Sequence, residues 1–221
     1  MSPDSATHAH AHADAGYGHV HGLVERSVKR SRAGVRAVAL ALGVLALTAA
    51  AQAAVFIATD SVALLSDLIH NAGDALTALP LATAFALRSA RAERYAGLFV
   101  VLAIVASACV AGAEAVARLI DANAPDHLFA LGLAGALGFV GNALAARIRT
   151  RAGRRLDSPA LLADGDHARA DALVSLGVVA SAALVWLGAP AADPLIGLAI
   201  AVVILRIAWR SWKTIRASEE H

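Results

Sequence analysis

Charged residues are scarce in this sequence, and their scarcity excludes an ordinary soluble domain. Only 16% of the 221 residues are Asp, Glu, Lys or Arg, whereas 58% are hydrophobic and the mean hydropathy is +0.64. Apolar stretches follow one another, and a helix needs roughly 20 such residues to cross a hydrocarbon core about 30 Å thick. The sequence therefore predicts a multi-pass integral membrane protein.

Cysteine is nearly absent, and the chain begins without the features of a cleaved leader. The single cysteine, Cys109, can form no intramolecular disulfide, and we expect it to be a small buried hydrophobic residue. The first residues are polar and His-rich, whereas a leader has a basic segment, a short apolar run and a small-residue cleavage site. We therefore expect a mature N-terminus without a signal peptide.

Six apolar stretches predict an all-α transmembrane domain over residues 35–216. A polar tail, residues 1–34, precedes this domain, and residues 217–221 form a short tail after it. No fold is expected in the first tail, because its composition is typical of disorder. The predicted helices span residues 35–59, 61–87, 95–119, 127–146, 160–187 and 194–212.

Basic residues alternate between the connections of these helices, and this pattern predicts the topology. They follow the second, fourth and sixth predicted helices: Arg88, Arg91 and Arg94; Arg147, Arg149, Arg151, Arg154 and Arg155; and Arg210, Lys213 and Arg216. The other connections have almost none. Because basic loops stay in the cytoplasm, both termini are predicted to be cytoplasmic, and no nucleic-acid partner is needed to account for the pI of about 9.1.

Two segments of the chain resemble each other at their ionisable positions. Residues 63–76 read ALLSDLIHNAGDAL, and residues 160–173 read ALLADGDHARADAL. Three acidic or histidine residues fall in register, namely Asp67, His70 and Asp74 with Asp164, His167 and Asp171. The copies lie three helices apart and so cross the membrane in opposite directions, which predicts an inverted repeat of three plus three helices.

The repeated residues form a polar stripe, because their i, i+3, i+7 spacing puts them on one face of a helix. Antiparallel packing would bring His70 level with Asp171, and Asp74 level with His167, near the middle of the membrane. An Asp at that depth costs about 2.5–3.5 kcal/mol and needs compensation. Two carboxylates and two neutral imidazoles carry a charge of about −2, which one divalent cation would neutralise.

The ligand chemistry narrows the choice of metal. A four-coordinate set of nitrogen and oxygen donors suits zinc, with cobalt(II) and iron(II) as alternatives, whereas magnesium and calcium prefer oxygen ligands alone. We therefore predict a zinc site. The alternative is that these residues only pair with one another across the helices.

Other polar residues near the stripe have two interpretations each. Asp67, Asn71, Asn142 and Asp164 are candidates for groups that orient the ligands or line an entry path, and the alternative is plain interhelical or water-facing packing. Asp166 and Arg169 are expected to pair locally or to reach the cytoplasmic interface.

Two further features are explained by packing and by the interface. Glycines at steps of three in the fourth predicted helix, Gly132, Gly135, Gly138 and Gly141, would let a neighbouring helix approach closely. Glu114, near the outer end of the third predicted helix, is expected to face the membrane interface.

Histidines recur in the N-terminal tail, as His8, His10, His12, His19 and His21. Imidazoles on a flexible chain can capture metal weakly, here on the cytoplasmic side. The alternative is a solvated tail that function does not need.

The motifs resemble those of the cation diffusion facilitator family of metal/proton antiporters. The resemblance is carried by HNAGD at 70–74 and HARAD at 167–171, with SVALLSD and GRRLDSPALLADGDHARAD around them and ADPLIG at 192–197. It implies that His70, Asp74, His167 and Asp171 bind the transported ion. The His-x-x-x-Asp form is similar to that of zinc-transporting members, with cobalt, cadmium and iron as other substrates.

This resemblance implies export of a divalent cation from the cytoplasm in exchange for protons, across the cell membrane and, in a bacterium, the inner membrane. No organic cofactor is implied. Most members continue beyond this point into a cytoplasmic metal-binding and dimerising domain, so ending at His221 predicts a short form and leaves a homodimer open. The connection after the second predicted helix is short, and we expect no metal site there.

Two rival functions come from other classes. An intramembrane metallohydrolase is disfavoured, because the sequence has no His-Glu-x-x-His pair and four protein ligands leave no position for an activated water. A metal sensor that does not transport, or a subunit that depends on a partner chain, is the remaining alternative.

Overall fold

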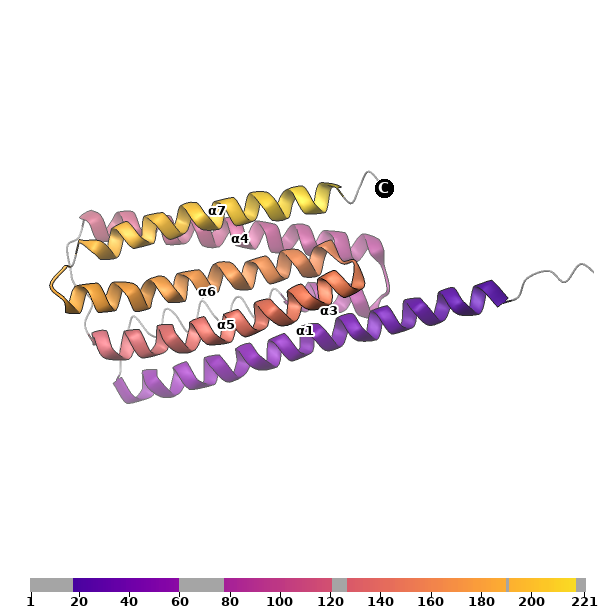
Figure 1. Ribbon diagram of the computed structural model, residues 1–221, viewed down its shortest axis with the longest axis horizontal. Helices are drawn as coiled ribbons and strands as arrows, with labels where there is room; N and C mark the ends of the chain where they lie inside the picture. The colour runs from indigo at the N-terminus through magenta and orange to yellow at the C-terminus, as the bar shows by residue number, and fades with distance from the viewer. Residues whose placement is uncertain (1–17, 60–77, 121–126, 190, 218–221) are drawn as a thin grey trace, which may run out of the picture.

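The computed structural model describes residues 18–59, 78–120, 127–189 and 191–217, and the side chains of these residues apart from 18–28 and 59. The elements in these ranges are α-helices: α1 (Gly18–Thr59), α3 (Ala78–Ala86), α4 (Ala90–Ile120), α5 (Leu128–Leu156), α6 (Pro159–Trp186) and α7 (Ala192–Ala217) (Figure 1). Five of them, all except α3, contain stretches long and apolar enough to cross a membrane. The part of the chain that the structure describes is therefore all-α, and its long apolar helices are those of a multi-pass membrane protein.

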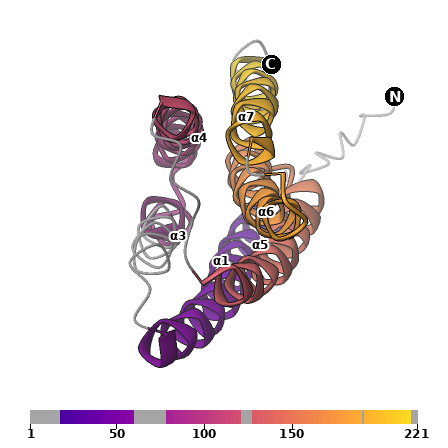
Figure 2. The same ribbon diagram turned by 90° about the vertical axis from the view of Figure 1, so that its left-hand side faces the viewer.

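The helices pack into one ring, in the order α1, α5, α6, α7, α4, α3 (Figure 2). Within it α6 contacts α3 and α4 as well as its neighbours α5 and α7. The main apolar cluster joins α4, α6 and α7 through Val100, Ile104, Ala170 and Ile204. Helix α6 is thus the most enclosed element, and it carries the second copy of the repeated motif.

The structure confirms some of the predicted helices, leaves other predictions untested and contradicts the one for Cys109. Helices α4, α6 and α7 agree with predicted spans, whereas α3 is the end of the span predicted over residues 61–87, whose first part lies outside the described residues. The six-helix count, the three-plus-three repeat and the cytoplasmic termini therefore stay predictions. Cys109 was expected to be buried, but this prediction is wrong, since its side chain is exposed on α4.

Two helix bounds correct the sequence analysis. Helix α1 begins at Gly18, so the expectation that residues 18–34 have no fold is wrong, and this part of α1 projects beyond the other helices (Figure 1). Helix α5 continues to Leu156 instead of ending near residue 146. The reason is the same in both places: Arg, Lys, Ala, Leu and Glu are good helix formers, and a helix can continue beyond its apolar part.

Small residues let α5 approach its neighbours closely, as the run of glycines predicts. A Cβ atom added at Gly135 would lie 3.0 Å from the backbone oxygen of Ser175 on α6. A Cβ atom at Gly141 would overlap the Thr48 side chain on α1 and lie 2.8 Å from its Cβ atom. Gly132 is different, because its nearest neighbour would be in ordinary contact at 3.8 Å.

A polar network fixes where α6 begins. Ser158 caps the helix by accepting a hydrogen bond from the Leu161 N–H, and its own hydroxyl donates to the buried Glu93 carboxylate on α4. Arg30 on α1 donates to both Glu93 oxygens, at 2.9 and 3.1 Å, and to the Leu156 carbonyl at 3.0 Å. One carboxylate therefore joins α1, α4 and the start of α6.

We expect Glu93→Gln to lower the stability of the folded chain by about 1.5–3 kcal/mol, the usual contribution of hydrogen bonds to a charged group. The Gln side chain is uncharged and has one acceptor oxygen, whereas the Glu93 carboxylate uses two oxygens to accept hydrogen bonds from Arg30 and Ser158. Thermal unfolding of the purified chain in detergent measures the change. Glu114→Gln is the control, because Glu114 is an exposed carboxylate on the same helix. Equal unfolding midpoints for the two variants would contradict this role of Glu93.

Candidate metal centre

Helix α6 is the scaffold of the candidate site. Pro159 lies in its first turn, where a missing N–H costs nothing, and Ser158 caps it. Alanine and glycine fill the helix around the motif, so that neighbouring helices cover it closely; the buried residues there include Ala163, Gly165, Ala168, Ala170 and Ala172. Packing therefore removes Asp164, His167 and Asp171 from solvent, whereas Asp166 is half-buried and Arg169 is exposed.

His167 and Asp171 lie one turn apart on α6 and are both buried. Their exposed fractions are 0% and 3%, and the distance from His167 Nε2 to Asp171 Oδ2 is 3.8 Å. Both lie within a stretch that can cross a membrane. An imidazole and a carboxylate so placed supply one nitrogen and one oxygen donor, which is half of a four-coordinate zinc site.

The other predicted ligands, His70 and Asp74, lie outside the described residues, together with Asp67 and Asn71. Within the ranges that the structure does describe, no group of three or more His, Cys, Asp or Glu side chains could hold a metal ion. The four-ligand site therefore stays a prediction. The described part of the chain provides the half of it that α6 carries.

Asp164, one turn before His167, forms a buried ion pair with Arg149 on α5. The distance from Arg149 Nε to Asp164 Oδ2 is 2.9 Å, and Arg149 Nη1 donates to the Asp164 backbone oxygen at 3.4 Å. The exposed fractions are 1% for Arg149 and 0% for Asp164. The structure thus shows Asp164 paired with a neighbouring helix next to the motif. Its part in orienting the metal ligands stays a prediction.

The sequence pattern groups Arg149 with the basic residues of a cytoplasmic connection and so does not reveal it as a neighbour of the motif. It lies in α5, with its whole side chain buried. The signal that could have found it is the spacing of the small buried residues on this helix, since Gly138, Asn142, Ala145 and Gly153 continue one helical face through position 149.

Asp166 and Arg169 pair locally, as predicted. Arg169 Nη1 donates to Asp166 Oδ1 at 2.7 Å, and Arg169 Nη2 donates to the Thr150 hydroxyl on α5 at 3.2 Å. Ser211 on α7 donates to the other Asp166 oxygen at 2.9 Å. This pair therefore ties α6 to both of its neighbours instead of contributing ligands.

The remaining candidates are Asn142 and the histidines of the N-terminal tail. Asn142 is buried on α5, and its part in a metal site stays a prediction. His8, His10 and His12 lie outside the described residues, whereas His19 and His21 lie within α1, where only the backbone is described. Weak metal capture by these histidines also stays a prediction.

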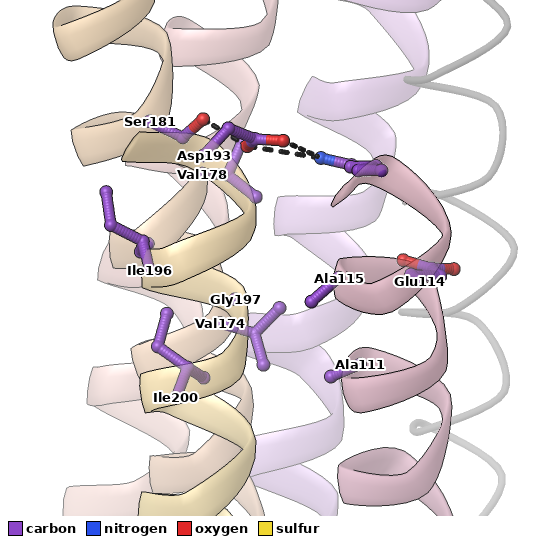
Figure 3. A pocket seen from close by; sticks show the side chains of 12 residues that line it. Ala111, Glu114, Ala115, Val174, Val178, Ser181, Asp193, Ile196, Gly197 and Ile200 are labelled. Atoms are coloured by element: carbon purple, nitrogen blue, oxygen red, sulfur yellow. Dashed lines mark hydrogen bonds and ion pairs between the residues drawn. The ribbon is translucent and has the colours of Figure 1, made fainter. Parts of the chain in front are cut away.

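A small pocket lies between α4, α6 and α7, toward the end of the bundle where α6 ends and α7 begins (Figure 3). Asp193 accepts hydrogen bonds from Ser181 and, at 3.1 and 3.2 Å, from Arg118. Val174, Ile196 and Ile200 make much of the wall apolar. Glu114 at its edge is exposed, in keeping with the interface position expected for it.

Comparison with known proteins bears on the function of this site. A family model described as the cation efflux transmembrane domain matches residues 38–216. Two probable cation efflux system proteins, from two strains of Mycobacterium tuberculosis, are each 46% identical over 195 residues, covering 83% of this chain and 59% of their own length. An uncharacterized transporter of Synechocystis is 31% identical over 179 residues, covering 75% of this chain and 57% of its own.

The chain spans less than two thirds of the length of these relatives. The match includes α6 with His167 and Asp171, as well as the motif at 70–74. The resemblance seen in the motifs is thereby confirmed, and the chain belongs to the cation efflux family, which consists of transporters and not of enzymes.

Proposed function

We propose that this chain exports a divalent metal cation, zinc first among them, from the cytoplasm in exchange for protons. The observation that carries the proposal is the buried His167 and Asp171 pair, 3.8 Å apart on a helix apolar enough to cross a membrane. Ionisable groups at such depth are expensive and mark ion pathways. The Mycobacterium relatives are probable cation efflux system proteins, which supports the direction of transport.

The donor set supports zinc as the substrate. His167 and Asp171 on α6, with His70 and Asp74 from the first copy of the motif, would give two nitrogen and two oxygen ligands. With neutral imidazoles these four side chains carry a charge of about −2, and one bound divalent cation makes the site neutral. Cobalt(II), cadmium and iron(II) are substrates with related preferences.

Proton exchange follows from the chemistry of the same ligands. Imidazoles take up protons near neutral pH, and a ligand must be deprotonated to bind a metal. When the site opens outward, protonation of both histidines would release the ion, and two imidazolium groups beside two carboxylates would again be neutral. This balance predicts exchange of about two protons for one divalent ion at the site. Rocking of one group of helices against the other would alternate the access.

The test is zinc uptake by everted membrane vesicles, whose cytoplasmic face points outward. We expect an imposed gradient, acidic inside, to accelerate uptake several-fold over vesicles without a gradient, and a protonophore to remove the acceleration. Cobalt, cadmium and iron are measured in the same way to rank the substrates. Uptake that does not respond to the gradient would contradict proton exchange.

A second candidate function is a membrane metal sensor that binds without transporting, or a subunit that needs a partner chain. The chain spans 59% of the length of its Mycobacterium relatives, so the activity of the whole protein is a proposal. Zinc binding by the purified chain without flux of any of the four metals would identify this alternative and overturn the transporter proposal.

A further inference from the structure

The buried Arg149–Asp164 pair is not accounted for by stability alone. Both side chains are essentially unexposed, and each belongs to a helix that can cross a membrane. Removing two charges from water costs several kcal/mol per ion, so a buried pair contributes about as much stability as apolar residues of the same volume, or less. Two apolar residues would pack equally well, so packing alone does not explain why this position holds a charged pair.

The nearest functional neighbour of Asp164 is His167. The two residues are three apart on α6 and therefore share a face of the helix. Both side chains have an exposed fraction of 0%. Its Oδ1 atom is buried and accepts no hydrogen bond from any residue in the part of the chain that the structure describes. A free acceptor oxygen is thus available on the side chain that neighbours the imidazole.

Arg149 fixes the position of that carboxylate. Its Nε atom lies 2.9 Å from Asp164 Oδ2, while its Nη1 atom donates to the backbone oxygen of the same residue. The helices touch at the next residue, because a Cβ atom added at Gly165 would lie 2.5 Å from Thr150 Oγ1 and 3.1 Å from the Thr150 nitrogen. Asp164 is therefore joined to α5 through its side chain and its backbone, next to a close contact between the two helices.

Arg149 also balances the negative charge that Asp164 would add beside the metal site. Asp164 would add one negative charge to a site whose four ligands already carry about −2, and a divalent cation could not neutralise the sum. Arg149 cancels this charge at 2.9 Å. The carboxylate can therefore act as a hydrogen-bond acceptor next to the site without changing the charge that the metal meets.

We propose that Asp164, clamped by Arg149, is a positioning residue that orients the His167 imidazole by accepting the N–H of the ring nitrogen that does not bind metal. A metal-binding histidine commonly donates its other N–H to a carboxylate, which fixes the ring and makes it a better ligand. The inference rests on the proposed function, since it takes His167 as a ligand of the transported ion. Asp164 itself is not a ligand.

The test is the zinc dissociation constant of the purified full-length chain, measured for Asp164→Glu and for the double variant Arg149→Gln/Asp164→Asn. The first keeps both charges and displaces the carboxylate, whereas the second removes both charges and leaves no ion unpaired. We expect each to raise the dissociation constant by about 10- to 100-fold. Asp157→Asn, at an exposed position between α5 and α6, should leave it unchanged.

Size-exclusion profiles and unfolding midpoints separate positioning from a purely structural role. A structural role predicts that any variant which assembles normally binds zinc like the unmodified chain, and that outcome would overturn the inference. If the double variant does not assemble, Asp164→Glu decides alone. Because the readout is binding, a failure of zinc uptake by the unmodified chain counts against the proposed function and not against this inference.

Discussion

Asp171→Ala should reduce gradient-driven zinc uptake into everted vesicles by more than about 100-fold. The substitution removes one of two oxygen ligands from a buried site, and changes to the partners of ligands alone cost about 10- to 100-fold in affinity. It also removes the carboxylate whose Oδ2 atom lies 3.8 Å from His167 Nε2. His167→Ala should have an effect of the same size, because a nitrogen ligand is lost.

The control for this series is Asp157→Asn. Asp157 follows α5, is exposed, and has φ 47° and ψ 54°, a left-handed conformation that Asn adopts well. The variant therefore removes a carboxylate near the same helix without strain and should keep the full uptake rate. Immunoblotting of the vesicles shows that each variant reaches the membrane. An Asp171→Ala protein that is present at normal levels and still transports at half the rate would contradict the proposed site.

Gly141→Leu should prevent the chain from assembling as a stable, monodisperse protein in detergent. At this position α1 and α5 meet through Thr48, and a Cβ atom alone would lie 2.8 Å from the Thr48 Cβ atom. A Cβ atom cannot rotate away, so the two helix backbones must separate. Overpacking of this kind costs about 1–3 kcal/mol and sometimes more, and the loosened contact joins α1 to the helix that also packs on α6.

Gly132→Leu is the matched control on the same helix. Its Cβ atom would meet only Ala182, at 3.8 Å, and the side chain would enter an open apolar groove beside Phe129, Val179 and Trp186. The unfolding midpoint of this variant should stay close to that of the unmodified chain. Size-exclusion chromatography and thermal unfolding compare the two. If both variants behave alike, close packing at Gly141 is not what joins α1 to α5.

Hydropathy predicted where the helices cross the membrane better than where they end. The bounds of α6 differ from the predicted span by one residue at each end, because Ser158 and Pro159 mark the start and Gly188 follows the end. By contrast, α5 runs on past residue 146 to Leu156. Hydropathy measures the preference for lipid, and an Arg- and Ala-rich segment can be helical without that preference.

For the candidate site, too, the sequence predicted some features and could not predict others. The spacing of His167 and Asp171 predicted two residues on one helical face, and the structure buries both. The partner of Asp164 could not be predicted, since it depends on how α5 and α6 are aligned against each other. Counting Arg149 with its basic neighbours gave it a place in a loop, whereas its contacts with α6 remove it from solvent.

The central claim, that two histidines and two aspartates from two copies of one motif bind one ion, is tested most directly by equilibrium zinc binding to the purified chain. The proposed site predicts one high-affinity zinc ion per chain, lost in each of four single variants, His70→Ala, Asp74→Ala, His167→Ala and Asp171→Ala, and retained in Asp157→Asn. Weak binding to the N-terminal histidines would remain in all of them. High-affinity binding that survives His70→Ala and Asp74→Ala would contradict the claim, because α6 would then bind the metal without the first copy of the motif.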